Sequence, residues 1–336
     1  MGFRIRKSFK LAPGVRMTVT PRGIGVSAGP RGAKLSVHSS GRVTQTLSLP
    51  GSGISHTETL RPSARPPGGS AVPRSPSRPS EPASPGPGLL APKWEKQLWT
   101  VTIRRPSPPD IADIAKLDPR SHHVVAFLET VMHLLPRADL PSARRRVEWL
   151  WSSGYDPARD PFLNRYMPDL TIVLGLTAEI TAALPADRDA LGLLLAELRQ
   201  ATGDIAQAID CVESLTPSSP TAVSLAELYA SQDRWRDIVD MTNELDNDDE
   251  LLTYLLIQRG VAFRELRMFD AARESFKRAL AARSRPTTLR HLGLVERGQC
   301  YLAKGKRAMA RKDFQKVLAE NANYPGLADQ LAAVAE

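Results

Sequence analysis

The amino-acid sequence predicts a mainly α protein: a solenoid of stacked helical hairpins, preceded by a small all-β domain and a disordered, proline-rich linker. Three observations support this prediction. A pattern of small and aromatic residues recurs along the C-terminal half, apolar and polar residues alternate between turn signals within residues 1–58, and ten prolines fall within residues 61–92. Recurrence at roughly 20–50 residues is the mark of stacked supersecondary units.

Residues 1–58 are expected to form a small basic β domain. Strands are predicted at 16–20, 23–28, 33–37, 43–49 and 54–57, because apolar and polar residues alternate there as in one-sided strands. Turn pairs such as Pro13–Gly14 and Ser40–Gly41 separate the strands. A domain of this length is marginally stable by itself.

Residues 59–93 are predicted to be a disordered linker, because a segment so rich in Pro, Ser and Gly buries too little surface to fold. Residues 94–188 follow as a short strand and a divergent helical layer. The strand is expected around Trp99, Val101 and Ile103, which share one side. Helices are expected at 111–117, 121–135, 142–153, 164–184 and 188–202.

The repeats are predicted over residues 189–336. Their pattern is most regular around two helices joined by a turn at 266–268, with Gly260, Phe263, Ala272, Phe276 and Ala279. It returns in the next unit as Gly298, Tyr301, Ala310, Phe314 and Val317, with a longer loop expected near 283–288. It is weaker in the preceding unit, at Ala226, Tyr229 and Ile238, and fainter still in the unit before that. Small residues let two helices approach closely, here Gly260 facing Ala272, and aromatic rings fill the space beside them.

These positions resemble the tetratricopeptide repeat, which is small at its eighth position, aromatic at its eleventh and twenty-fourth, and Ala at its twentieth and twenty-seventh. The segments 253–286 and 291–324 match well, 219–252 moderately and 189–218 weakly. Two departures stand out: Arg199 and Thr242 each replace an aromatic residue. A helical bundle with chance spacing is the alternative.

A second resemblance covers residues 1–58. The opening Met1-Gly-Phe-Arg-Ile-Arg-Lys-Ser8 and the closing Pro50-Gly51-Ser52-Gly53 are similar to a bacterial N-terminal domain family of unknown function. No activity is assigned to that family. Residues 1–60 hold nine Lys or Arg and one acidic residue, whereas the whole chain has a net charge of +9. An anion-binding face is therefore expected, at Arg4, Arg6, Lys7, Arg22 and Arg31. The alternative is a charged outer face that prevents edge pairing.

The rest of the sequence favours a soluble, cytoplasmic protein that is not an enzyme. It shows no secretion signal, no membrane span, no catalytic motif, no metal-ligand spacing and no cofactor fingerprint. The two cysteines, Cys211 and Cys300, are expected to be buried thiols of a reducing compartment. The oligomeric state stays open.

The resemblance to tetratricopeptide repeats implies a groove lined by residues of the first helix of each hairpin. By register these are Tyr254, Ile257, Val261, Arg264, Glu265, Leu292, Val295 and Gln299. The set favours an apolar or helical peptide, although a neighbouring layer or an oligomer contact is an equally good reason for their chemistry. Two functions follow: a non-catalytic protein–protein interaction adaptor whose basic module meets an anionic surface, or a nucleic-acid- or polyanion-binding protein whose repeats self-associate.

Overall fold

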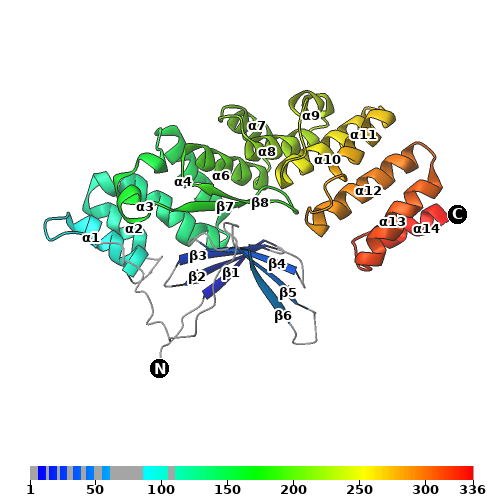
Figure 1. Ribbon diagram of the computed structural model, residues 1–336. Helices are drawn as coiled ribbons and strands as arrows, with labels where there is room; N and C mark the ends of the chain where they lie inside the picture. The colour runs from blue at the N-terminus through cyan, green and yellow to red at the C-terminus, as the bar shows by residue number, and fades with distance from the viewer. Residues whose placement is uncertain are drawn as a thin grey trace, which may run out of the picture. The chain divides into compact units, whose positions relative to one another are not determined.

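The computed structural model describes six strands within residues 7–60, then residues 86–104 and 110–335, with side chains from 86–104 and 110–332. The chain forms two compact units. The first contains Met1–Gly175 and Ala183–Thr202, and the second contains Leu176–Ala182 and Gly203–Glu336. Helices dominate both units beyond residue 92 (Figure 1).

The strands near the N-terminus form one antiparallel sheet in sequential order, β1-β2-β3-β4-β5-β6. They are β1 (Lys7–Ala12), β2 (Val15–Thr20), β3 (Gly23–Ala28), β4 (Ala33–His38), β5 (Val43–Ser48) and β6 (Ser55–Leu60). The register is regular, with Met17 opposite Val26 and Val37 opposite Val43, apart from a shift between Lys10 and Ala12. β1 has no counterpart among the five strands expected from the sequence. The proline-rich segment 61–85 lies outside the described residues.

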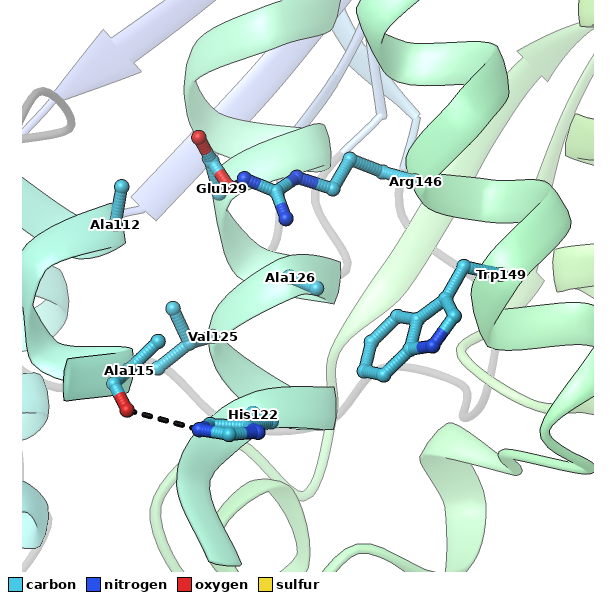
Figure 2. Close-up of a pocket in the computed structure, with 8 residues that line it drawn as sticks. All are labelled: Ala112, Ala115, His122, Val125, Ala126, Glu129, Arg146 and Trp149. Atoms are coloured by element: carbon cyan, nitrogen blue, oxygen red, sulfur yellow. Dashed lines mark hydrogen bonds and ion pairs between the residues drawn. The ribbon is translucent and has the colours of Figure 1, made fainter. Parts of the chain in front are cut away.

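The remainder of the first unit is built from short helices. They are α1 (Lys93–Trp99), η1 (Thr100–Arg104), α2 (Ile111–Ile114), η3 (Ala115–Leu117), η4 (Pro119–Ser121), α3 (His122–Glu129), η5 (Thr130–Leu134), η6 (Leu135–Arg137), α4 (Leu140–Ser152), η7 (Pro157–Arg159), α5 (Pro161–Tyr166) and α6 (Arg188–Ala201). Helices α2, α3 and α4 border a pocket that Figure 2 shows from close by.

The strand expected around Trp99 is helical instead. α1 continues into the π-helical turn η1, and the hydroxyls of Thr100 and Thr102 each donate to a carbonyl four residues back, at 2.7 Å in both cases. Back-bonding of this kind lets a threonine remain in a helix despite its preference for strands. The side-chain alternation that suggested a strand was therefore misleading.

The prediction of a single helix over 164–184 is also wrong. α5 ends at Tyr166, and Pro168 follows, a residue that cannot continue a helix. The chain then forms a two-stranded sheet of β7 (Thr171–Gly175) and β8 (Thr181–Pro185). Ile172, Leu174 and Leu176 are buried at every second position, which is the period of a strand.

The second unit is a series of antiparallel helix pairs. Its helices are α7 (Ile205–Glu213), α8 (Ser219–Ala230), α9 (Trp235–Met241), α10 (Glu250–Glu265), α11 (Phe269–Ala279), α12 (Thr287–Ala303), α13 (Arg307–Glu320) and α14 (Leu327–Ala335). The turn and the long loop predicted from the sequence are both present, at 266–268 and 280–286. α6, which the repeat pattern assigns to the first hairpin, groups with the first unit.

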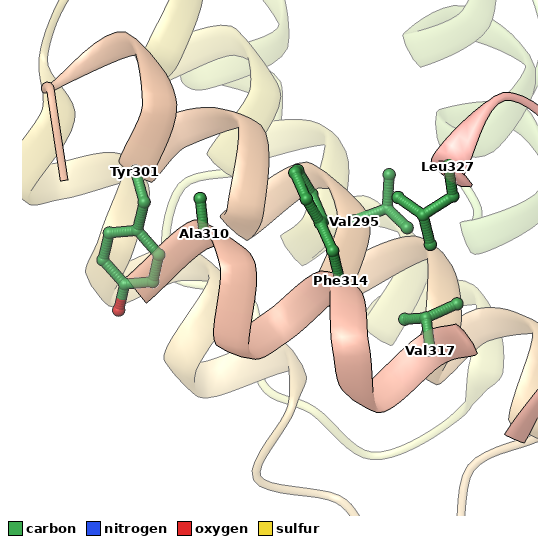
Figure 3. Packing of buried hydrophobic residues seen from close by; sticks show 6 residues of the cluster. All are labelled: Val295, Tyr301, Ala310, Phe314, Val317 and Leu327. Carbon is green, nitrogen blue, oxygen red and sulfur yellow. The ribbon is translucent and has the colours of Figure 1, made fainter. Parts of the chain in front are cut away.

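Glycine lets an aromatic ring enter each of the two regular hairpins, α10/α11 and α12/α13. A β-carbon built at Gly260 would lie 2.5 Å from Cε1 of Phe276, and one built at Gly298 would overlap the ring of Phe314. The closest neighbour of Gly260 is thus this ring, rather than Ala272 as the sequence suggested. Figure 3 shows Phe314 of the last hairpin among buried neighbours, which include Val295, Ala310 and Val317 of the same hairpin and Leu327 of α14.

In hairpin α8/α9, an alanine and polar groups occupy the space that glycine and the aromatic ring fill in the other two hairpins. Ala226 takes the place of the glycine and Thr242, only 1% exposed, takes the place of the ring. The Thr242 hydroxyl donates to the carbonyl of Ile238 at 2.5 Å. Arg259 of α10 donates to the carbonyls of Val239, at 3.1 Å, and of Thr242. An arginine from the next hairpin therefore caps the C-terminal end of α9.

The turn between the helices of each pair contains one residue with a left-handed backbone. These residues are Gly203, Asp233, Arg267 and Gly305, with φ between 53° and 84°. The conformation costs little for glycine and more for any residue with a β-carbon. The four turns thus share one geometry although only two of them have the residue best suited to it.

Two further observations concern the helical part. No helix among the described residues combines the length and the apolar composition needed to cross a bilayer. Cys211 of α7 and Cys300 of α12 are both buried, as the sequence predicted. Burial raises the pKa of the Cys300 thiol above its usual value.

Candidate functional site

The first unit contains a pocket of about 380 Å³ bordered by α2, α3 and α4 (Figure 2). Its polar side chains already have partners. Glu129 forms an ion pair with Arg146 at 3.0 Å, and Nε2 of His122 lies 3.0 Å from the carbonyl oxygen of Ala115. Trp149, at the edge of the pocket, is 42% exposed and stacks on His123. The pocket therefore has an aromatic wall, and the charges of Glu129 and Arg146 in its lining compensate each other.

The second unit has a surface on which the first helices of successive hairpins lie side by side. α10 contacts both α8 and α12. We call the surface where the side chains of α8, α10 and α12 meet the first-helix face. Side-chain caps fix where α8 and α10 begin: Ser218 accepts from the Thr221 amide, and Asp249 accepts from the Leu252 amide at 2.8 Å.

A tyrosine and a carboxylate connect α8 to α10 on this face. The Tyr254 hydroxyl donates to Glu227, and Nε2 of Gln258 donates to the Tyr254 oxygen at 2.5 Å and to Glu227 Oε1 at 3.2 Å. Burial raises the pKa of the Glu227 carboxyl, the Tyr254 hydrogen bond lowers it, and the charge of Glu179 adds to the increase, so that the net direction is upward. Glu227 is thus a half-buried carboxylate held by neutral donors.

An arginine connects α10 to α12. Nη1 of Arg264 lies 2.6 Å from Glu296 Oε2 and donates to Gln299 Oε1 at 2.9 Å, while Nε lies 2.9 Å from Glu265 Oε1. Burial lowers the pKa of the Arg264 guanidinium, but Glu296 and Glu265 raise it by more. The charge of Glu296 is therefore compensated, in contrast to that of Glu227.

A third carboxylate comes from the turn between β7 and β8. This turn and the first residues of β8 group with the second unit as Leu176–Ala182, and we call this segment the hairpin tip. Burial raises the pKa of the Glu179 carboxyl at its centre, the Thr177 hydroxyl lowers it, and the charge of Glu296 raises it further. Glu179 also raises the pKa of the Tyr324 hydroxyl, after burial, which is the larger cause. The hairpin tip therefore lies within electrostatic reach of the first-helix face.

The eight groove residues predicted from the sequence occupy α10 and α12. Tyr254, Ile257 and Val295 are buried, Glu265 is exposed, and the remaining four are half-buried: Val261, Arg264, Leu292 and Gln299. Among these eight the structure links Arg264 to Glu265 and to Gln299. Of the predicted anion-binding residues, Arg4, Arg6, Arg22 and Arg31 lie outside the described residues, and Lys7 opens β1.

Sequence reasoning missed the carboxylates Glu179, Glu227 and Glu296. Glu227 and Glu296 are on first helices, at positions outside the register used to choose the groove. Glu179 was assigned to a helix. The signal that marks it as a turn residue is the β-branched run Thr171-Ile172-Val173 followed by Thr177, whose hydroxyl accepts from the amides of Glu179 and Ile180.

The second unit has the architecture of a tetratricopeptide-like solenoid, and comparisons with known proteins agree. Residues 3–57 match the family described as protein of unknown function DUF4236, and residues 293–324 match the tetratricopeptide repeat. The second match spans most of hairpin α12/α13. No curated relative of the sequence was found.

Solved structures with a similar fold include the N-terminal domain of the EccA1 ATPase from the ESX-1 secretion system of Mycobacterium tuberculosis. It is 17% identical, with a TM-score of 0.50 over 73% of this chain and 90% of that chain. A thermophilic tetratricopeptide repeat protein from Thermus thermophilus, TTC0263, is 16% identical, with a TM-score of 0.38 over 65% of this chain and 98% of that chain. At 17% identity, the similarity to the EccA1 domain concerns the fold alone.

Proposed function

We propose that this protein is a non-catalytic adaptor that binds a protein or peptide partner on the first-helix face. A tetratricopeptide-like fold supports interaction with other proteins in general. The observation that carries the proposal is the alignment of three first helices, α8, α10 and α12, with half-exposed side chains such as Val261, Leu292 and Gln299 between them. Rigid helices place these side chains more precisely than loops would.

The adaptor function is tested with a pair of surface variants of the full chain. Glu265→Arg combined with Leu292→Arg changes the first-helix face. Met309→Arg, at a residue of α13 that is 44% exposed, is the matched control. Proteins cross-linked to the wild type in a bacterial lysate are identified by mass spectrometry. We expect the face variant to lose at least one of them and Met309→Arg to retain it. Equal recovery by all three proteins would contradict the proposal.

We further propose that the N-terminal module attaches the adaptor to an anionic surface. The support is the sequence charge, nine Lys or Arg against one acidic residue within residues 1–60. The test is co-sedimentation of the full chain with vesicles containing phosphatidylserine, and retardation of DNA, at two salt concentrations. Replacing Arg4, Arg6, Lys7, Arg22 and Arg31 by Ser should abolish salt-sensitive binding. If the wild type binds neither probe at low salt, this part of the proposal is wrong, while the adaptor function stands.

A further inference from the structure

The last hairpin of the second unit has an exposed, strongly basic surface. Residues 304–316 hold six Lys or Arg and one acidic residue, Asp313, which is buried and accepts two hydrogen bonds from Arg297 of α12, each at 2.7 Å. Lys304 forms an ion pair with Asp270 at 2.7 Å. The other five cations are exposed, and none forms an ion pair with a residue that the structure describes. We call these five residues the α13 basic face: Lys306, Arg307, Arg311, Lys312 and Lys316.

The charges of the α13 basic face do not stabilise the helix that carries them. Lys306 is the N-cap of α13 and makes no side-chain cap bond, Arg307 follows it, and the first turn contains no acidic residue. Cations are unfavourable at this positive end of the helix dipole. Arg307 and Arg311 are four residues apart, as are Lys312 and Lys316, and like charges at this spacing repel. The stability of α13 therefore does not account for these charges.

Helix α11 has a different arrangement of charges at the same register. Its first turn contains Asp270 and its last turn contains Lys277, as the helix dipole favours. Glu274 forms an ion pair with Lys277 at 3.1 Å. At the corresponding positions of α13, Ala308 replaces Asp270 and Lys312 replaces Glu274. Because the two hairpins share one architecture, that architecture does not require a basic second helix.

The second unit also has a surface of opposite charge. Residues 237–250, which run from α9 to the first residue of α10, hold seven acidic residues and no Lys or Arg. Asp237 forms an ion pair with Arg234 at 2.7 Å. The other six carboxylates are exposed and form no ion pair within the described part of the chain. We call these six residues the acidic segment: Asp240, Glu244, Asp246, Asp248, Asp249 and Glu250.

Hydrogen bonds fix the backbone of the acidic segment. Arg278 donates to the carbonyl of Leu245, and Arg285 donates to the carbonyl of Asn247 at 2.6 Å. The Asn247 side chain donates to the carbonyl of Ala279 at 3.1 Å. These arginines bind backbone carbonyls, so the carboxylates stay exposed. A backbone that is already fixed loses little entropy when a partner binds.

Within one copy of the chain the two charged surfaces are separated by hairpin α10/α11, because α10 contacts α8 and α9 on one side and α12 on the other (Figure 1). We propose that the α13 basic face docks on the acidic segment of a second copy of this chain. Charge complementarity carries the proposal: five exposed cations of one copy face six exposed carboxylates of the other. Each copy has both surfaces, so two copies form a symmetric dimer with two such contacts, or successive copies form an open series. The inference goes beyond the proposed adaptor function and does not depend on it.

Charge reversal in the full chain tests this contact, with self-association measured by sedimentation velocity at low salt. Lys312→Glu with Lys316→Glu changes the α13 basic face, and Asp246→Lys with Asp248→Lys changes the acidic segment. Each double variant should self-associate at least about tenfold more weakly than the wild type, because like charges then face one another. An equimolar mixture of the two variants should associate again, as should one chain with all four changes. High salt should dissociate the wild type.

The matched control is Arg273→Glu with Lys277→Glu on α11, which changes the net charge by the same amount and should leave self-association unchanged. Circular dichroism shows whether each variant is folded. If the reversed α13 variant is not, Lys312→Gln with Lys316→Gln takes its place and should give a smaller loss. A wild type that is monomeric at low salt overturns the proposal, and so does a mixture of folded variants that does not regain association.

Two further outcomes would assign the charged surfaces to other partners and overturn the proposal. The first is loss of self-association when the five basic residues of the N-terminal module are replaced by Ser, with full association of the α13 variant. The N-terminal module would then be what contacts the acidic segment. The second is weaker binding of the α13 variant to vesicles containing phosphatidylserine, with unchanged self-association, which would assign the α13 basic face to an anionic lipid surface.

Discussion

Hairpins α12/α13 and α8/α9 have the same architecture and different interiors. In the first, a glycine accepts a phenylalanine ring, Gly298 against Phe314. In the second, Ala226 and Thr242 occupy the corresponding positions, and Arg259 of the next hairpin caps the short helix α9. The backbone arrangement therefore depends less on the ring than on having some well-paired group between the two helices. A buried ring fills the space within its own hairpin, whereas the polar arrangement depends on an arginine from the next hairpin.

The largest expected effect comes from removing the ring. Phe314→Ala should lower the free energy of unfolding of α12 and α13 by about 3–5 kcal/mol, because it leaves a cavity in a fully buried cluster. Thr242→Ala, which removes less volume, should cost about 1–2 kcal/mol. Native-state hydrogen exchange of each hairpin measures the difference, since a chain of two units is not expected to unfold in one step. Met309→Ala on the exposed side of α13 is the control. Similar losses in the two hairpins would remove the distinction.

The second prediction concerns variants in which interior residues of α8/α9 are replaced by those of α12/α13, and the reverse. Thr242→Phe should destabilise α8/α9 by about 1–3 kcal/mol, because the β-carbon of Ala226 occupies the space that the ring needs. Adding Ala226→Gly should recover most of that loss. The reciprocal change, Gly298→Ala, should destabilise α12/α13 by a similar amount. A double variant no more stable than Thr242→Phe alone would show that Ala226 is not what excludes the ring.

A smaller effect is expected at the turns. Gly305→Ala places a β-carbon in a left-handed conformation, φ 74°, and should cost about 1 kcal/mol. Arg267→Gly removes the same strain, φ 60°, and should stabilise α10/α11 by less than this amount, because glycine also adds freedom to the unfolded chain. Native-state hydrogen exchange of α12/α13 in the first variant and of α10/α11 in the second gives the sign of each effect. Equal signs would contradict a common turn geometry.

The final prediction concerns two acidic groups, one in the hairpin tip and one on the first-helix face. The carboxyls of Glu179 and Glu227 have pKa values raised above the ordinary 4.5, chiefly by burial. The native state therefore holds more protons than the unfolded state between 4.5 and the raised values, and its stability rises as pH falls through that window. Tyr254, Glu296 with Arg264, and Tyr324 face the same region.

We expect slower amide exchange at residues 176–180 at mildly acidic pH, after correction for intrinsic exchange rates. The effect should be smaller in Glu179→Gln. Exchange that accelerates as pH falls from neutral would mean that loss of the Arg264–Glu296 pair outweighs the gain from protonating Glu179 and Glu227.

The repeat architecture could be predicted from the sequence because its determinants are local and recur. Gly260 with Phe276 and Gly298 with Phe314 stand at equal separations, and the turn and the long loop between them follow from the same register. The substitution of Thr242 for an aromatic residue was also visible. Its compensation by Arg259 was not, because that contact joins residues 17 apart in different hairpins.

The two incorrect predictions in the first unit share a cause. Residues 100–104 and 171–185 both contain β-branched runs, which favour strands in one context and are tolerated in helices in another. Hydrogen bonds of Thr100 and Thr102 decide the first case, and Pro168 together with the Thr177 turn decides the second. The candidate site depends on that second case, so a periodicity analysis alone could not have found it.

The two cysteines allow the opening of the repeat unit to be measured by alkylation. Cys211 and Cys300 are the chain's only thiols and lie in separate hairpins, one in α7 and the other in α12. Each is shielded by packing, so an alkylating reagent can modify it only when its own helix pair separates. The modification rates at the two sulfur atoms therefore compare how often opposite ends of the array open, without any label being introduced.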